Sequence, residues 1–308
     1  MKALVGYTGF VGSNLAASTN FDGLYNSKNV SEAYGTKPDL LVYAGVPAAK
    51  YLANKAPEED LAIIRQAAEN IAKIAPKKLV LISTIDVFPE PVGVDENTAP
   101  KESSEAYGRN RRELELRVRE QYANALIVRL PALFGKNLKK NFIYDIIHPI
   151  PFKLTEKLLT DFLEREPQLK EYYFPCGNGF FQRKEMDDST EKSVKEIFER
   201  LGFSALNFTD SRSSYQFYPL SRLWQDIETA LHHNLRIFHP ATEPVSAGEL
   251  YSQLTGLKFI NELAKTPARY NYKTCHAALF GGHGDYIMTK SLVFNKIKEF
   301  FNNGQIHH

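Results

Sequence analysis

The stretch Ala3-Leu-Val-Gly6-Tyr-Thr-Gly9-Phe-Val-Gly12 decides the fold. An apolar strand leads into three glycines, and residues 11–17 have the pattern of a helix. Gly6 permits a tight turn, Gly9 lets a ligand approach the backbone, and Gly12 allows close contact between helix and sheet. A helix N-terminus at this place offers unpaired N–H groups to phosphates. The stretch therefore predicts a dinucleotide-binding loop, and a purely structural turn is the alternative.

Short apolar runs alternate with longer mixed segments through the first half of the chain. The predicted strands are Ala3–Val5, Gly23–Asn26, Leu40–Tyr43, Leu79–Ser83 and Leu126–Arg129. The predicted helices are Val11–Ala17, Glu58–Ile74 and Ser104–Gln121. Such alternation is typical of a parallel sheet covered on both faces. We therefore predict an α/β fold, with a Rossmann-type doubly wound parallel sheet and a smaller C-terminal α+β substrate domain.

The pattern changes after about Phe134, and Pro149-Ile-Pro151 marks a break. We predict a dinucleotide-binding domain over residues 1–150 and a substrate-binding region with helical insertions over 151–308. Segments near 205–245 are candidates to return to the sheet. The predicted helices of this region are Leu154–Leu169, Glu191–Leu201 and Lys290–Phe301.

Composition narrows the classes of function. The 308 residues include 38 basic and 36 acidic side chains, a net charge of +2, so no broad electrostatic field favours nucleic acid or a membrane surface as partner. No apolar run approaches the roughly 18–20 residues that span a bilayer. The two cysteines, Cys176 and Cys275, cannot form a disulfide framework. We expect a cytoplasmic protein without a signal peptide.

Residues Tyr25-Asn26-Ser27-Lys28 follow the second predicted strand. An acidic residue there would bind the ribose 2′-hydroxyl of NAD, whereas a nearby cation would accommodate the 2′-phosphate of NADP. No carboxylate follows the strand, while Lys28 offers charge and Asn26 and Ser27 offer hydrogen bonds. NADP is therefore the preferred cofactor and NAD the second choice. The alternative is that Lys28 is a solvated loop lysine.

Two further motifs accompany the glycine loop. The fourth predicted strand ends in Ser83-Thr84-Ile-Asp86-Val-Phe88, and Tyr107-Gly-Arg-Asn-Arg111 follows it. With the GxxGxxG spacing, these motifs resemble the extended short-chain dehydrogenase/reductases of the NAD-dependent epimerase/dehydratase superfamily. In motif spacing they are closest to dTDP-4-dehydrorhamnose reductases, with S-T-x-x-V-F and Y-G-x-x-K. The resemblance is good over residues 1–150 and patchy beyond.

The resemblance implies an NAD(P)-dependent oxidoreductase that acts on a nucleotide-linked 4-keto sugar, a small-molecule partner. Tyr107 would give the proton, and Thr84 would hydrogen-bond the keto oxygen. Arg111 stands where the family has a lysine. A cation four residues along a helix lies one turn from the phenol, so we expect Arg111 to lower the pKa of Tyr107 and to hold the nicotinamide ribose.

The predicted site residues fall into three groups. The catalytic group is Tyr107, Thr84 and Arg111. The cofactor-binding group is Gly6, Thr8, Gly9, Phe10, Val11, Gly12, Asn26, Ser27, Lys28, Ala44, Gly45, Val46, Ser83, Tyr107, Arg111 and Pro131. The substrate-binding group is Asp86, Asn141 and Gln216. No metal site is predicted, because the spacing of Cys275, His276, His283 and Asp285 matches no paired zinc pattern.

Arginine is planar and does not shuttle a proton, so the change at Arg111 leaves two alternatives open. One is a nucleotide-sugar epimerase or dehydratase that recycles its cofactor. The other is a redox-inactive dinucleotide-binding protein, in which Arg111 marks lost catalysis. A homodimer is compatible with the superfamily, although the charged helix Ser104–Gln121 argues mildly against a dry interface there.

Overall fold

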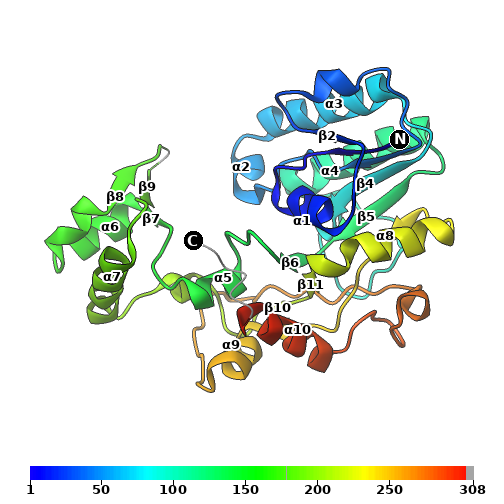
Figure 1. The fold of residues 1–308 in the computed structure, drawn as a ribbon. Helices are drawn as coiled ribbons and strands as arrows, with labels where there is room; N and C mark the ends of the chain where they lie inside the picture. The colour runs from blue at the N-terminus through cyan, green and yellow to red at the C-terminus, as the bar shows by residue number, and fades with distance from the viewer. Residues whose placement is uncertain (178, 303–308) are drawn as a thin grey trace. The chain divides into compact units, whose positions relative to one another are not determined.

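A six-stranded parallel sheet, in the order β12-β5-β4-β3-β1-β2, forms the centre of the fold (Figure 1). The computed structural model describes residues 1–177 and 179–302. The strands are β1 (Lys2–Val5), β2 (Gly23–Tyr25), β3 (Leu40–Tyr43), β4 (Leu79–Thr84), β5 (Leu126–Leu130) and β12 (Ile237–Phe238). The predicted doubly wound parallel sheet is confirmed, and each predicted strand differs from β1–β5 by at most one residue at either end.

Helices cover both faces of this sheet. Helices α3 (Pro57–Ile74) and α4 (Ala106–Gln121) pack together, and α1 (Phe10–Ser18) contacts α8 (Leu223–His232) (Figure 1). Apolar residues of α3 and α4 share one buried cluster with alternate residues of β1, β3, β4 and β5. Strand β1 lies between β2 and β3, so the direction of winding reverses at β1 and β3. In doubly wound sheets ligands bind at the carboxyl ends of the strands at that reversal.

The chain divides into two compact units. The first contains residues 1–138, 214–245 and the chain from Ala268 onward, and the second contains residues 139–213 and 246–267. This division differs from the predicted boundary at residue 150, because the chain leaves the first unit after Leu138 and returns to it twice. Strand β12 carries one returning segment into the central sheet.

The first unit holds several shorter elements. They are α2 (Lys50–Lys55), α10 (Lys290–Asn302), the paired strands β6 (Ala132–Phe134) and β11 (Phe217–Pro219), β10 (Ser214–Tyr215), and the 3-10 turns η1 (Val30–Ala33), η2 (Ile85–Val87), η5 (Leu220–Arg222) and η6 (Ala277–Phe280). Strand β13 (Val245–Ser246) lies where the chain passes to the second unit. No helix in residues 1–177 and 179–302 is long and apolar enough to cross a bilayer.

The second unit is a small α+β arrangement around the antiparallel sheet β7-β9-β8. Its elements are β7 (Lys153–Thr155), β8 (Tyr173–Pro175), β9 (Phe180–Arg183), α5 (Phe142–Ile147), α6 (Glu156–Leu163), α7 (Asp188–Leu201), α9 (Ala247–Thr255), η3 (Pro167–Glu171) and η4 (Ala205–Phe208). The predicted single helix Leu154–Leu169 is wrong. Residues 153–155 pair with β9, the Thr155 hydroxyl caps α6, and Pro167 begins a separate turn.

Asp145 of α5 provides a test of burial in the second unit. Asp145 is half-buried, and this burial raises the pKa of its carboxyl to about 7. The folded state therefore holds the proton more tightly than the unfolded chain does. The contribution to stability is fully present below about pH 4 and is lost as the pH rises to about 7.

We therefore expect Asp145→Asn to match the wild type near pH 4. At pH 8 it should exceed the wild type by up to about 4 kcal/mol in free energy of unfolding, because the amide carries no charge. Urea unfolding at both pH values measures this. Asp161→Asn, at an exposed position of α6, is the control. Equal midpoints for the wild type and Asp145→Asn at pH 8 would contradict the expectation.

Candidate functional site

The glycine loop between β1 and α1 packs directly against neighbouring backbone. Gly6 has a φ of +94°, and a Cβ at this position would lie 2.4 Å from the carbonyl oxygen of Ala44. A Cβ at Gly12 would lie 2.0 Å from the carbonyl oxygen of Gly6. Both positions therefore require glycine, and the loop touches both the end of β3 and the first turn of α1.

The N-terminus of α1 is open to an anion. Gly9 is the N-cap and is exposed, and a Cβ there would meet only the carbonyl oxygen of Gly6, at 3.3 Å. No side chain caps this helix, and its first turn contains no acidic residue. The first-turn amides, which belong to the predicted residues Phe10, Val11 and Gly12, are therefore placed to donate to a phosphate group.

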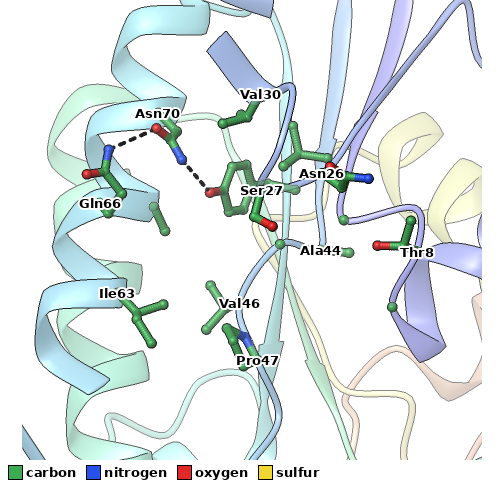
Figure 2. A pocket seen from close by; sticks show the side chains of 16 residues that line it. Thr8, Asn26, Ser27, Val30, Ala44, Val46, Pro47, Ile63, Gln66 and Asn70 are labelled. Carbon is green, nitrogen blue, oxygen red and sulfur yellow. Dashed lines mark hydrogen bonds between the residues drawn. The ribbon is translucent and has the colours of Figure 1, made fainter. Parts of the chain in front are cut away.

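A pocket of about 470 Å³ lies beside the loop, at the carboxyl ends of β1 and β3 (Figure 2). Eight predicted cofactor residues line it: Gly6, Thr8, Gly9, Asn26, Ser27, Ala44, Gly45 and Val46. The other lining residues are Val5, Val30, Tyr43, Pro47, Ile63, Gln66, Ala67 and Asn70. Sequence reasoning missed the wall that α3 contributes. The spacing of Ile63, Gln66 and Asn70 along one helical face is the signal that identifies this wall.

Asn70 organises the polar part of that wall. Its Oδ1 accepts hydrogen bonds from the Tyr34 hydroxyl at 2.7 Å and from Gln66 Nε2 at 3.0 Å. Its Nδ2 donates to the Tyr43 hydroxyl at 3.3 Å (Figure 2). Burial raises the pKa of Tyr43, so its phenol keeps its proton at neutral pH. The wall thus presents neutral hydrogen-bonding groups, and none of the residues that line the pocket is acidic.

The remaining predicted cofactor residues lie outside the pocket lining. Lys28 is exposed, and its backbone N–H donates to Asn26 Oδ1 at 2.8 Å, which fixes the turn after β2. The Ser83 hydroxyl donates to buried Glu115 at 2.7 Å, and Pro131 is half-buried after β5. Tyr107 and Arg111 stand together at the start of α4. The pocket is therefore lined by predicted cofactor residues in and near the glycine loop. Tyr107 and Arg111, which are also predicted to be catalytic, do not line it.

Arg111 is buried, with 4% of its surface exposed, and it is bound to a carboxylate. Its Nη1 donates to Asp60 Oδ2 at 2.6 Å, and its Nη2 donates to the carbonyl oxygen of Pro47 at 2.7 Å. The guanidinium carbon lies 3.9 Å from the centre of the Tyr107 ring. The structure therefore brings Arg111 and Tyr107 together. The guanidinium stacks on the face of the ring and forms its ion pair with Asp60.

The pKa of the Tyr107 phenol is raised. Burial is the main cause, and the Asp86 and Asp60 carboxylates raise it further. Arg111 and the Thr84 side chain lower it without reversing the direction. Arg111 thus lowers the pKa of Tyr107 as expected, but the phenol is still less acidic than an ordinary tyrosine. The reason is that burial of the phenol outweighs a guanidinium already neutralised by Asp60.

Thr84, Asp86 and Tyr107 meet where α4 packs on η2. A Cβ at Gly108 would lie 1.9 Å from the carbonyl oxygen of Asp86, so the two segments are in backbone contact. Thr84 Oγ1 accepts a hydrogen bond from the Asp86 N–H at 3.2 Å. Because that bond uses a lone pair, the Thr84 hydroxyl hydrogen is left for another acceptor.

The Asp86 carboxylate is held by two side chains. The Tyr270 hydroxyl donates to its Oδ1 at 2.8 Å, and Lys50 Nζ lies 3.4 Å from its Oδ2. Sequence reasoning missed Tyr270, which lies 184 residues from Asp86 in the chain and belongs to no motif. The side chain of Asp86 keeps 19% of its surface exposed, so part of the carboxylate remains accessible.

The other two predicted substrate residues are Asn141 and Gln216. Asn141 belongs to the second unit, where its Oδ1 accepts a hydrogen bond from the Tyr144 N–H at 3.1 Å and caps α5. Gln216 is 1% exposed, and its Nε2 donates to the carbonyl oxygens of Thr242 and Tyr272 at 2.5 and 2.9 Å. The predicted substrate contact of Gln216 is contradicted, because backbone groups occupy its buried amide.

Residues 4–153 match the family model of the RmlD substrate binding domain. No curated protein matches the sequence. A dTDP-4-dehydrorhamnose reductase from Bacillus anthracis str. Ames in complex with NADP has a similar fold, with a TM-score of 0.64 and 18% identity over 98% of this chain and 99% of that chain.

Two other solved structures are similar. The dTDP-4-dehydrorhamnose reductase from Yersinia enterocolitica has a TM-score of 0.63 and 14% identity over 97% of this chain and 98% of that chain. The Bordetella bronchiseptica enzyme WbmG, in complex with NAD and UDP, has a TM-score of 0.62 and 14% identity over 98% of this chain and 94% of that chain. At these identities the likeness shows a shared fold.

The close approach at Gly6 predicts a large effect of one methyl group. Gly6→Ala should lower the free energy of unfolding by at least about 2 kcal/mol more than Gly35→Ala does. Gly35 also has a positive φ, +71°, but its Cβ would meet nothing within 4 Å, so only the backbone strain is shared. Urea unfolding of both variants measures the difference. Equal losses would show that the contact with Ala44 does not constrain the loop.

The buried ion pair between Arg111 and Asp60 predicts a second difference in stability between two variants. Asp60→Asn leaves the Arg111 guanidinium buried without a counter-charge, so we expect a loss of about 3–5 kcal/mol. The control is Glu113→Gln, which breaks a more exposed ion pair, between Glu113 and Arg117 of α4. It should change the free energy of unfolding by no more than about 1 kcal/mol. Guanidinium chloride unfolding compares them. A small loss for Asp60→Asn would mean that the pair is not buried in solution.

Proposed function

We propose that this chain belongs to the extended short-chain dehydrogenase/reductase superfamily and is an NAD(P)-dependent oxidoreductase that reduces the keto group of a nucleotide-linked 4-keto sugar. One observation carries the proposal: Tyr107 and Thr84 lie close to each other where α4 packs on η2, in the unit that carries the open glycine loop. Structures of similar fold were solved with NADP, with NADPH and with NAD and UDP.

The loop and pocket fit the adenosine diphosphate half of a dinucleotide. The uncapped first turn of α1 would hold the pyrophosphate, and the pocket between the glycine loop and α3 would hold the adenosine. NADP is favoured, because Asn26 and Ser27 line the pocket, Lys28 is exposed beside them, and no lining residue is acidic. The bound cofactor would supply a hydride to the carbonyl carbon.

Tyr107 would supply the matching proton. Its raised pKa keeps the phenol protonated at neutral pH, which is the state that gives a proton to a developing alkoxide. The Thr84 hydroxyl, with one lone pair used by the Asp86 N–H, would donate to the same oxygen. A protonated phenol favours reduction over the first step of an epimerase, which begins by removing a proton from a sugar hydroxyl.

Asp86 would orient the substrate. The Tyr270 hydroxyl and the Lys50 ammonium hold its carboxylate beside Tyr107, and the exposed part of the carboxylate can accept a hydrogen bond from a sugar hydroxyl. That Asn141, in the second unit, contacts the substrate stays a proposal. A homodimer likewise stays a prediction.

The Arg111–Asp60 pair favours a second candidate function, a redox-inactive dinucleotide-binding protein. Nη1 of Arg111 is bound by Asp60 and lies 3.3 Å from the carbonyl oxygen of Tyr107, while Nη2 is bound by Pro47. A guanidinium held in this way has little freedom to bind the nicotinamide ribose. On this reading the pocket binds a dinucleotide, and Tyr107 is an ordinary buried tyrosine.

Turnover of NADPH separates the two functions. We expect the wild type to oxidise NADPH with a member of a dTDP-4-keto-sugar panel. Tyr107→Phe should lower kcat by about 10²–10⁴-fold and leave NADPH binding unchanged, because only the proton donor is lost. Stopped-flow absorbance and fluorescence titration provide the two measurements.

The matched control is Tyr122→Phe, which removes the hydroxyl of a tyrosine at the far end of α4 and should change neither quantity. Protein that binds NADPH but turns over no sugar of the panel, with Arg111→Lys giving no gain, would favour the redox-inactive candidate. Protein that retains NAD(H) through purification and does not consume added cofactor would favour the epimerase.

A further inference from the structure

Glu96, Cys275 and His276 form a cluster in the first unit that the proposed reduction does not use. The ligand atoms of the three side chains lie within 4.8 Å of one another. Cys275 Sγ is 3.3 Å from Glu96 Oε2 and 3.5 Å from His276 Nε2. We propose that these residues bind a divalent metal ion of the zinc class, with water as the fourth ligand.

The two contacts of the Cys275 sulfur fit a tetrahedral ion. Zinc binds sulfur at about 2.3 Å and nitrogen or oxygen at about 2.0–2.2 Å, so adjacent ligand atoms of a tetrahedral site lie about 3.5 Å apart. Both contacts of the Cys275 sulfur are close to this value. An ion at this place would bond to all three groups at once.

Hydrogen bonds hold the Glu96 carboxylate in place. Oε1 accepts from the Thr274 hydroxyl at 2.6 Å and from the His239 backbone N–H at 2.9 Å. Oε2 accepts from the Cys275 backbone N–H at 2.9 Å. Metal-binding carboxylates are typically fixed in this way by surrounding donors. The carboxylate is thus preorganised next to the sulfur.

The charge around Glu96 also fits a cation. Glu96 is 9% exposed, and in the part of the chain that the structure describes no lysine or arginine forms an ion pair with it. The nearby Lys273 ammonium is paired with Asp285 at 2.7 Å. A buried carboxylate without a counter-ion is unfavourable, so a divalent ion would compensate both Glu96 and the Cys275 thiolate.

The solvent exposure of the site and the types of its ligand atoms indicate which metal ion it would bind. Cys275 is exposed and His276 is half-buried, so an ion from solvent can reach them and keep one bound water. Thiolate and imidazole ligands favour zinc over magnesium or calcium. Binding releases the Cys275 thiol proton to water, and no oxidation or reduction occurs. The ion would join the loop that contains Glu96 to the segment that precedes η6.

Cobalt(II) is the probe for this site, added to the reduced full-length chain. We expect one equivalent to bind with a thiolate-to-cobalt charge-transfer band, and zinc to displace it. Cys275→Ser should abolish the charge-transfer band and weaken cobalt binding at least about 100-fold. His276→Ala should also weaken cobalt binding. Cys176→Ser, which changes the other exposed cysteine, and His283→Ala, at an exposed position of the same segment, should retain it.

Zinc should also raise the melting temperature of the wild type and of Cys176→Ser, but not of Cys275→Ser. If Cys275→Ser does not fold, His276→Ala carries the test. A missing charge-transfer band, or a band that survives in Cys275→Ser, would overturn the proposal. NADPH binding and turnover are measured on metal-free protein, so failure of this site leaves the proposed reduction independently testable.

Discussion

The buried ion pair between Arg111 and Asp60 is the interaction on which the candidate site depends. It joins α4 to α3, and Asp60 also accepts a hydrogen bond from Asn110 at 2.9 Å. Removing two charges from water is unfavourable by several kcal/mol per ion, so such a pair persists only with close hydrogen bonds on both partners. Burial raises the pKa of Tyr107, and Asp60 offsets the charge of Arg111, so Tyr107 retains its proton and the site favours an acid over a base.

The sheet topology explains why this acid and the dinucleotide pocket occur in one unit. The winding direction reverses at β1 and β3, so the glycine loop and Ala44 meet at the carboxyl edge of the sheet. Strand β4 lies next to β3 and ends at the same edge in Thr84, beside the start of α4. The glycines at positions 6, 12 and 108 allow backbone segments to approach more closely than any side chain permits.

Local pattern predicts the elements of this unit well. Strand β3 matches its prediction at both ends, and the glycine loop has the predicted strand–turn–helix setting, because these features depend on adjacent residues. Long-range partners could not be predicted. Asp60 lies 51 residues from Arg111 and Tyr270 lies 184 residues from Asp86, and no spacing rule connects either pair. Its position in the sequence predicts a substrate contact for Gln216, but its buried amide donates to carbonyl oxygens 26 and 56 residues further along the chain.

The protonation state of Tyr107 tests the central claim most directly. Carbon-13 NMR of ring-labelled tyrosine, with the Tyr107 signal assigned from its loss in the phenylalanine variant, follows the phenol as pH is raised. We predict that Tyr107 titrates above the tyrosine reference value of about 10, because it is buried and Asp60 neutralises Arg111. Titration between about pH 6 and 8 would contradict the account, since Arg111 would then act on Tyr107 as an uncompensated cation.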